Sequence, residues 1–221
     1  MAIDFERIRT DLFTAVIGDV LDQRGYTHQF LAAGLVPLVP GTRLVGRAMT
    51  VLEAPYSDGA GRGPLSDKPF GLMFEALDDL KPGEIYIADG ASLSCALWGG
   101  LMSTRALHLK AAGAILNGYV RDTSEIRRLG FPVFSRGAYA QDQGVRGKVV
   151  DYRMPLQIGA VSIRDGDLIV ADDEGVLIVP QEVETEVIAA AEEKVATENE
   201  VAIAIKGGMS TVDAFRKFGV M

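Results

Sequence analysis

The sequence predicts one α/β domain over residues 1–221, in which mixed sheets combine with an N-terminal helix and a long C-terminal helix. Three observations predict this class. The middle of the chain alternates strand-like and helix-like segments, short apolar segments separated by turns follow residue 147, and no linker composition divides the chain. With 48% hydrophobic and 24% charged residues, the chain has an ordinary globular composition and enough length to bury a core.

The first third of the chain predicts two helices and one strand. Apolar residues at helical spacing predict a helix over Phe5–Arg24, with Gly25 as its stop signal. Thr42–Leu52 has the composition of a strand, and Ala54–Pro64 is rich in Gly, Pro and small polar residues, which predicts a mobile loop. A helix is then expected over Asp67–Leu80, ended by a Lys-Pro-Gly sequence.

The middle of the chain predicts a βαβ unit. The strand Glu84–Ala88, the helix Leu101–Ala112 and the strand Ala114–Val120 follow one another at the length of such a unit. The two strands should therefore be parallel, with a right-handed crossover. A short helix over Thr123–Leu129 and a strand over Pro132–Ser135 continue the pattern.

The last third predicts a β-rich stretch followed by helices. The acidic sequence Asp172-Asp173-Glu174-Gly175 separates the last two strands, so it is expected to be a hairpin turn. A final short helix should be capped by Ser210 or Thr211. The other predicted elements are strands over Lys148–Tyr152, Leu156–Ile163, Leu168–Ala171 and Val176–Val179 and a helix over residues 182–206.

Charge and residue counts exclude several classes of protein. The chain carries 22 basic and 30 acidic residues, a net charge of -8, so no general binding to nucleic acid or to an anionic membrane is expected. No apolar stretch has the ~20 residues of a membrane span, and the first residues do not resemble a signal peptide, so a soluble, cytoplasmic protein is expected. The single cysteine excludes an internal disulfide and a cysteine-cluster metal site. The two histidines lie far apart in the sequence, so no multi-histidine zinc site is expected.

Arg121 and Asp122 come directly after the second strand of the βαβ unit. Ligands of α/β sheets collect at the carboxyl ends of parallel strands. An arginine fork can pair with a carboxylate, and an aspartate oxygen suits Mg²⁺ or Mn²⁺. The alternatives are a surface ion pair, or Asp122 as the N-cap of the helix Thr123–Leu129.

Gly99 and Gly100 precede the helix of the βαβ unit. Two glycines leave the first backbone N–H groups of the helix uncovered, near Leu101 and Met102, and such groups bind anions. The site would face Arg121 and Asp122 if the preceding turn stays near the strand ends. The alternative is a plain tight turn.

The remaining polar candidates have structural explanations. The glycine-rich sequence Gly59–Gly63 lacks the pattern of a phosphate loop and is expected to be a flexible loop or lid. His108 is expected to be a structural histidine within its helix, and His28 to lie on the surface. Cys95 is expected to be a small buried hydrophobic residue.

A longer signature resembles a known family. Gly100, twenty intervening residues and then Arg121-Asp122-Thr123-Ser124-Glu125 match the x20-R-D-x2-E/D spacing of class II pyruvate aldolases of the 4-hydroxy-4-methyl-2-oxoglutarate type. These aldolases are similar to the RraA regulators of ribonuclease activity. The stretches PLVPGTRLVGRAMTV, KPGEIYIADG, GAILNGYVRD and DGDLIVADDEGVLIVP extend the resemblance over residues 10–205.

The resemblance implies a swivelling β/β/α-type fold, assembled as a homotrimer or as a hexamer, with each site between subunits. Asp122 would bind Mg²⁺ or Mn²⁺ largely through water, and Arg121 would contact the carboxylate and keto oxygen of the pyruvyl group. Backbone N–H groups at Gly99, Gly100, Leu101 and Met102 would hold the other side of the carboxylate. The C-terminal helix, residues 182–206, would pack on a neighbouring subunit and bring an acidic residue such as Glu198 to its metal.

The function implied is cleavage of a 4-hydroxy-2-oxo acid to pyruvate through an enolate, with oxaloacetate decarboxylation by the same chemistry. The small α-keto acid would be the partner, with Arg121 and Asp122 as the catalytic pair. A non-catalytic RraA-like regulator of ribonuclease activity is the alternative. One departure is that many relatives carry an acidic residue at the position of Gly100, so a water-mediated metal contact is expected to be missing here.

Overall fold

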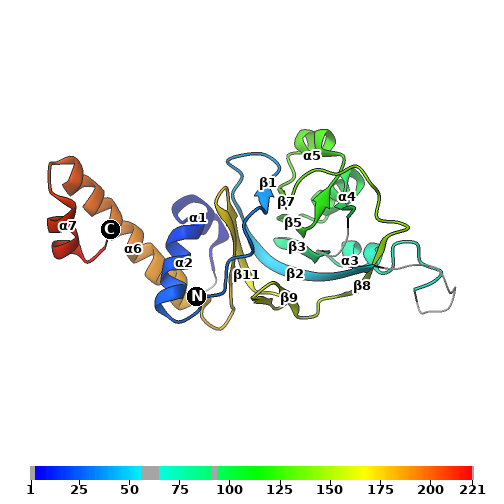
Figure 1. Ribbon diagram of the computed structural model, residues 1–221, viewed down its shortest axis with the longest axis horizontal. Helices are drawn as coiled ribbons and strands as arrows, with labels where there is room; N and C mark the ends of the chain where they lie inside the picture. The colour runs from blue at the N-terminus through cyan, green and yellow to red at the C-terminus, as the bar shows by residue number, and fades with distance from the viewer. Residues whose placement is uncertain (1–2, 56–64, 91–93, 221) are drawn as a thin grey trace.

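The computed structural model describes residues 3–55, 65–90 and 94–220. Within this part of the chain, an eight-stranded mixed sheet forms the centre (Figure 1). Its strands are β1 (Val36–Pro37), β2 (Leu44–Pro55), β3 (Glu84–Asp89), β5 (Gly113–Asn117), β7 (Val133–Ser135), β8 (Gly147–Tyr152), β11 (Leu168–Asp172) and β12 (Gly175–Val179). Seven of them follow the order β1-β7-β5-β3-β2-β11-β12, and β8 pairs with β2. The expected α/β class with a mixed sheet is confirmed.

The predicted βαβ unit is present. β3 pairs in parallel with β5, and α4 (Gly100–His108) lies between them in the chain. β2 also runs parallel to β3, and β7 runs parallel to β5 after α5 (Thr123–Leu129). The carboxyl ends of these strands therefore share one edge, where Asn117 Nδ2 of β5 donates to Asp89 Oδ1 of β3 at 2.7 Å.

Two small sheets differ from the prediction. Ala96–Trp98 forms β4, which pairs in parallel with β6 (Tyr119–Val120), although the small residues before it predict only a turn. The predicted strand 114–120 is interrupted at Gly118, so β6 belongs to this second sheet. The predicted strand 156–163 is a hairpin of β9 (Leu156–Ile158) and β10 (Val161–Ile163), because Gly159 has a φ of +61° and reverses the chain.

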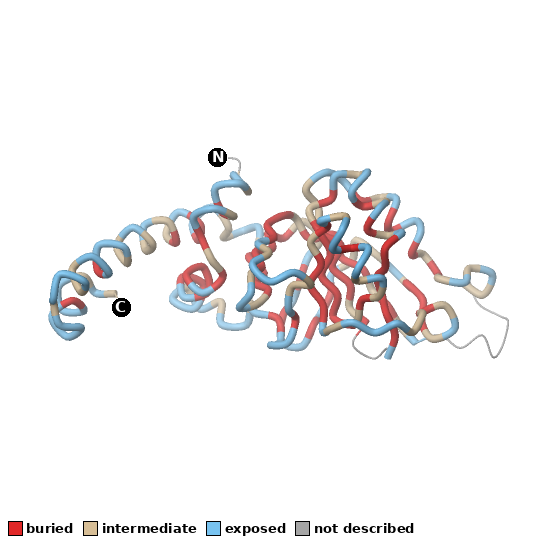
Figure 2. The backbone as a smooth tube through the Cα atoms, turned by 90° about the horizontal axis from the view of Figure 1, so that it is seen from above, coloured by how far each residue is buried: buried red, intermediate tan, exposed pale blue. Residues whose placement is uncertain are grey.

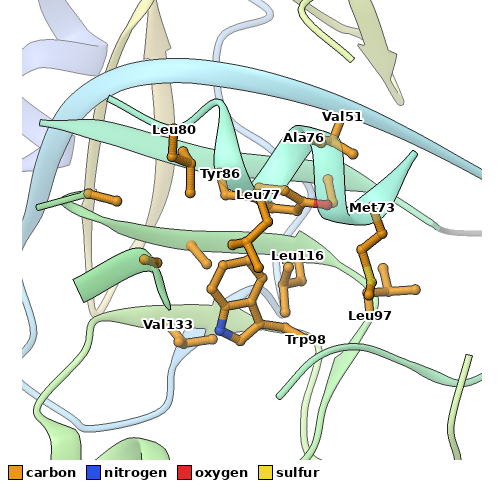
Figure 3. Packing of buried hydrophobic residues seen from close by; sticks show 14 of the residues in the cluster. Val51, Met73, Ala76, Leu77, Leu80, Tyr86, Leu97, Trp98, Leu116 and Val133 are labelled. Atoms are coloured by element: carbon orange, nitrogen blue, oxygen red, sulfur yellow. The ribbon is translucent and has the colours of Figure 1, made fainter. Parts of the chain in front are cut away.

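Three groups of buried side chains hold the fold together. The first packs α3 (Met73–Asp78), α4 and α5 on one face of the sheet, around Trp98, Tyr86 and Leu116 (Figure 3). The second lies under the β9–β10 hairpin on the other face. The third joins α1 (Phe5–Asp11), α2 (Thr14–Gln23) and the start of α6 (Glu184–Lys206) to β11 and β12.

The predicted N-terminal helix is two helices. α1 ends at Asp11, and Phe13 is extended, with φ -142° and ψ 161°. The cause is a distant residue: Asp172, the last residue of β11, accepts hydrogen bonds from Thr14 N (2.9 Å) and Thr14 Oγ1 (2.8 Å). The Asp172 carboxylate therefore caps α2 from another part of the chain, which local helical spacing does not show.

Removal of this cap should destabilise the fold. Asp172→Ala leaves the buried Thr14 N–H and hydroxyl without their acceptor, so we expect a loss of about 1–2 kcal/mol in the free energy of unfolding. Urea unfolding measures it. Asp173→Ala is the matched control, because Asp173 accepts from the exposed Gly41 N–H, which water can satisfy. Equal losses in the two variants would contradict the role of Asp172.

Two helices beside the site are shorter than predicted. α3 begins at Met73, not at residue 67, because Pro69 precedes a turn at Gly71. Gly71 has a φ of +63°, and a Cβ there would lie 2.2 Å from Val149 O. α4 ends at His108, since Lys110 adopts a φ of +61° and reverses the chain before β5.

The C-terminal helices project from the body of the molecule. α6 packs against α2 near its start, and its later turns extend away from the sheet with α7 (Thr211–Phe218) folded back beside them (Figures 1 and 2). Ser210 caps α7, as predicted. The apolar side chains of Ile203, Val212 and Phe215 are 57–71% exposed on this arm. In the described ranges, no helix combines the length and the apolar character that crossing a membrane requires.

Candidate functional site

A pocket of about 220 Å³ lies between the start of α4 and the segment that follows β6. It contains the predicted pair Arg121 and Asp122, together with Gly99, Leu101 and Met102 from the predicted helix start. The other lining residues are Phe70, Met73, Phe74, Ala96, Leu97, Trp98, Asp142 and Gln143. The start of α4 thus faces the same pocket as Arg121 and Asp122.

The start of α4 is held against Asp122. Gly100 is the first residue of the helix, and its N–H donates to Asp122 Oδ2 at 3.0 Å. A Cβ at Gly99 would lie 2.7 Å from this same oxygen, and a Cβ at Gly100 would lie 2.5 Å from Glu125 Oε2. The two glycines therefore allow two carboxylates to approach the positive end of the helix. A side chain at either position would therefore crowd the carboxylate of Asp122 or that of Glu125.

Asp122 does not cap α5 with its side chain. It occupies the N-cap position with φ 56° and ψ 33°, a left-handed conformation that aspartate tolerates better than most residues. Its backbone oxygen accepts from Glu125 N at 3.0 Å, while its side chain turns to the start of α4. Asp122 therefore occupies the predicted N-cap position without a side-chain cap hydrogen bond, and its carboxylate is 45% exposed at the pocket.

Arg121 is oriented by two contacts. Its backbone N–H donates to Trp98 O at 2.9 Å, which joins the chain after β6 to β4. Its NH1 group lies 2.7 Å from Asp142 Oδ1, whereas its Nε lies 3.8 Å from Asp122 Oδ2. Asp142 was not predicted, since it lies in a loop twenty residues further on and reaches the site only through the bridge between Ala96 and Asp142.

The opposite wall of the pocket is apolar. Phe70, Met73 and Phe74 come from the turn before α3 and from its start, and Leu101 and Met102 come from the first turn of α4. Leu101 is 84% exposed, so its side chain stands at the rim. A molecule in the pocket therefore meets charge and hydrogen-bond donors on one side and apolar surface on the other.

Comparisons with known proteins assign the family. The RraA-like model, described as Aldolase/RraA, matches residues 14–178. The chain belongs to this family. Over 214 residues it is 29% identical to a Halalkalibacterium halodurans protein named provisionally as a 4-hydroxy-4-methyl-2-oxoglutarate aldolase, covering 96% of this chain and 94% of that protein.

Two further proteins resemble this RraA-like chain. It is 31% identical over 205 residues to Protein DlpA of Legionella pneumophila, and the match covers 92% of this chain but spans only about a third (32%) of DlpA. A crystal structure of an uncharacterized protein from Pseudomonas syringae has 28% identity and a TM-score of 0.80, with 95% of each chain covered. The α/β fold is thus that of the RraA-like family.

A buried polar cluster that no sequence motif indicates lies beneath the pocket of this RraA-like chain. It is formed by Glu53, Tyr86 and Gln143. Glu53 is the last buried residue of β2 and is 4% exposed. Gln143 is 2% exposed. Burial raises the pKa of Glu53 from 4.5 to about 8; the Gln143 amide opposes this and the nearby Asp89 adds to it. Burial and the Glu53 charge also raise the pKa of Tyr86.

The raised pKa of Glu53 predicts a pH-dependent stability. Between about pH 5 and pH 8, folded Glu53 keeps a proton that the unfolded chain loses, so stability falls as pH rises, by up to about 1.4 kcal/mol per pH unit. Glu53→Gln replaces the titrating carboxyl group with an amide that does not titrate. Urea unfolding at several pH values should therefore show a shallower decline for the variant. Parallel curves for the two proteins would contradict a neutral Glu53.

The other sequence candidates lie elsewhere. His28 is exposed, as predicted, and Cys95 is buried with its pKa raised by burial, which keeps the thiol unreactive. His108 is exposed at the end of α4, so the prediction of a structural histidine was wrong. Most of the glycine-rich loop, including Gly59–Gly63, lies outside the described residues.

Glu198 does not reach the pocket of its own chain. Its carboxylate lies 3.7 Å from Lys194 Nζ on the same helix. α6, which carries both residues, is at the opposite end of the molecule from α4 (Figure 1). A contact between Glu198 and an Asp122 would therefore have to come from another copy of the chain.

Proposed function

We propose that this RraA-like chain is a divalent-metal-dependent lyase that cleaves 4-hydroxy-2-oxo acids to pyruvate and decarboxylates oxaloacetate. The observation that carries the proposal is the meeting of Arg121, Asp122 and the start of α4 in one pocket. These groups supply a carboxylate-binding fork, an oxygen ligand and helix N–H donors. The aldolase name of the Halalkalibacterium relative supports the same reaction.

The donor set fits a hard cation held largely through water. Asp122 is half exposed at the pocket, and Glu125 lies close to the same helix start. Among the described residues no group of three acidic, histidine or cysteine side chains forms a cage. Mg²⁺ commonly binds through one or two carboxylates and keeps several waters, and Mn²⁺ accepts the same oxygen ligands. Such an ion supplies a Lewis acid for the 2-keto oxygen.

The residues of the chain bind and orient the substrate. The Arg121 guanidinium, which Asp142 holds, would pair with the pyruvyl carboxylate. The N–H groups of Leu101 and Met102 have no acceptor within the first turn of α4, so they can donate to the same carboxylate. Both sets of donors also offset the negative charge that develops as the C3–C4 bond breaks and the enolate forms. The apolar wall at Phe70 and Phe74 suits the carbon skeleton of the departing carbonyl product.

We further propose that the active unit is a homotrimer or a hexamer. The α6–α7 arm, residues 198–218, carries the exposed apolar side chains of Ile203, Val212 and Phe215 and extends away from the sheet (Figure 2). A second copy that covered the arm would bury this surface and bring the acidic face of α6, including Glu198, to a neighbouring pocket. The active site would then be complete only in the assembly.

A pyruvate-release assay tests the reaction. The substrates are oxaloacetate and a panel of monocarboxylic and dicarboxylic 4-hydroxy-2-oxo acids, each with added Mg²⁺, with Mn²⁺ and with EDTA. Release that requires the ion supports the lyase. No release from any of them would overturn it and favour the second candidate, a non-catalytic RraA-like regulator of ribonuclease activity. The family description names RraA beside aldolase.

A further inference from the structure

The buried polar cluster of Glu53, Tyr86 and Gln143 is not explained by folding. Four of its atoms have no hydrogen-bond partner among the described residues: Glu53 Oε1 and Oε2, Tyr86 OH and Gln143 Nε2. Each buried polar atom left in this state costs about 1–3 kcal/mol. Three such side chains gathered in one place are unusual, and a group of this kind requires a specific explanation.

The cluster is connected to the pocket by Gln143. This residue lines the pocket beside Asp142, which holds Arg121. Its amide lies close enough to the Glu53 carboxyl to lower its pKa, although Gln143 Nε2 has no hydrogen-bond partner among the described residues. Glu53 enters the cluster from β2 at a shift in the pairing with β8, between Leu52 and Glu53. Tyr86 and Met73 belong to the same group of buried side chains, which Figure 3 shows beside α3.

The protonation state of Glu53 determines how it can hold the amide. A neutral carboxyl group has a proton to donate to the Gln143 carbonyl, and this leaves the amide NH₂ for the pocket. An ionised carboxylate only accepts, so it would take the amide N–H and turn the carbonyl toward the pocket. The first arrangement offers a donor to an anionic substrate, and the second offers an acceptor that repels it.

The surroundings of Glu53 favour the neutral form. Tyr86 and Asp89 face it from β3, and Asp89 repels a second negative charge. Cys95 is buried nearby, before β4. Burial raises the pKa of its thiol, and the negative charge of Glu53 raises it further. On β8, the Lys148 amino group donates to Leu65 O. The pKa of Glu53 near 8 places the change of form just above neutral pH.

We propose that the Gln143 amide is a substrate-binding donor of this pocket, and that neutral Glu53 is the positioning residue that turns its NH₂ group toward the bound 2-oxo acid. This inference rests on the proposed function for the identity of the ligand. It adds a third donor to Arg121 and the start of α4. Binding of the anionic substrate would then depend on whether the Glu53 carboxyl group, beneath the pocket, is protonated.

Calorimetric binding of pyruvate between pH 6.5 and pH 9, with excess Mg²⁺, tests the inference. The affinity of the wild-type protein should fall about tenfold between pH 7 and pH 9, as the fraction of neutral Glu53 falls. Glu53→Gln should bind tightly across the range, because its amide can donate to Gln143 at every pH, whereas Glu53→Leu should bind weakly. Gln143→Met should bind weakly at every pH.

Tyr86→Phe is the matched control, because it removes an unpartnered hydroxyl from the same cluster without touching Gln143. It should follow the wild-type pH profile. A wild-type profile in Glu53→Gln would overturn the inference, and so would one in Gln143→Met, since the Glu53 charge would then act without the amide. If Glu53→Leu does not fold, the binding profiles of Glu53→Gln and Gln143→Met still test the inference.

The pyruvate-release panel keeps the two proposals separate. A protein that releases no pyruvate but binds it with this pH profile overturns the proposed lyase and supports the role of Gln143. A protein that releases pyruvate, with the same KM in Gln143→Met as in the wild type, overturns the role of Gln143 and supports the lyase.

Discussion

Replacement of Asp122 by asparagine is expected to lower kcat/KM for oxaloacetate by at least about 10²-fold, the scale of losing one electrostatic stabiliser in an active site. The asparagine side chain has nearly the same volume and can still accept from the Gly100 N–H. Asparagine also tolerates the left-handed backbone of this position, where φ is 56°. The variant therefore removes only the charge, so its stability in urea should match that of the wild type.

Comparison of Asp122→Ala with Asp122→Asn separates the effect of backbone strain from the effect of losing the charge. Alanine in the left-handed conformation adds strain of about 1–2 kcal/mol, so this variant should be less stable as well as inactive. Asp78→Ala is the control outside the pocket: its carboxylate forms an exposed pair with Arg105, which contributes about 1 kcal/mol or less. Full activity of Asp122→Asn, or full activity of the wild-type protein in EDTA, would refute the metal-dependent lyase.

The parts of the fold that were predicted correctly depend on local signals. The βαβ unit was predictable because strand, helix and strand follow one another with glycine stops, and the pairing of β3 with β5 confirms it. The break at Phe13 was not, because the residue that causes it, Asp172, is distant in the chain. The short α3 likewise depends on the contact between Gly71 and β8.

The same division applies to the site. Arg121, Asp122 and the glycine pair were predictable because strand ends and helix starts have recognisable sequences, and Arg121, Asp122 and Gly99 line one pocket. Asp142 and Gln143 lie in a loop with no motif, and the sheet brings them to the pocket through the bridge at Ala96. Glu53 is a single acidic residue in an apolar strand. It indicates a polar cluster only once the structure shows that its side chain is buried.

The second large effect is expected from the α6–α7 arm. Deletion of residues 198–221 removes Glu198, the end of α6 and α7, but leaves the part of α6 that packs on α2 in the third buried group, including Val187 and Ala191. The truncated chain should therefore fold. It should release no pyruvate if each pocket requires an acidic side chain from the arm of a neighbouring copy, and a loss of at least about 10²-fold is expected.

Complementation separates a shared site from simple damage. The truncated chain has an intact Asp122, and the Asp122→Asn chain has an intact arm, so a pocket at their junction contains both. Random mixing in a ring of copies makes such pockets about a quarter of the total, so the co-expressed and co-purified pair should recover about a quarter of wild-type activity. Each variant alone should stay inactive. A fully active wild-type monomer by light scattering, or mixed oligomers with no recovered activity, would show that each chain holds a complete site and that the arm acts only within its own subunit.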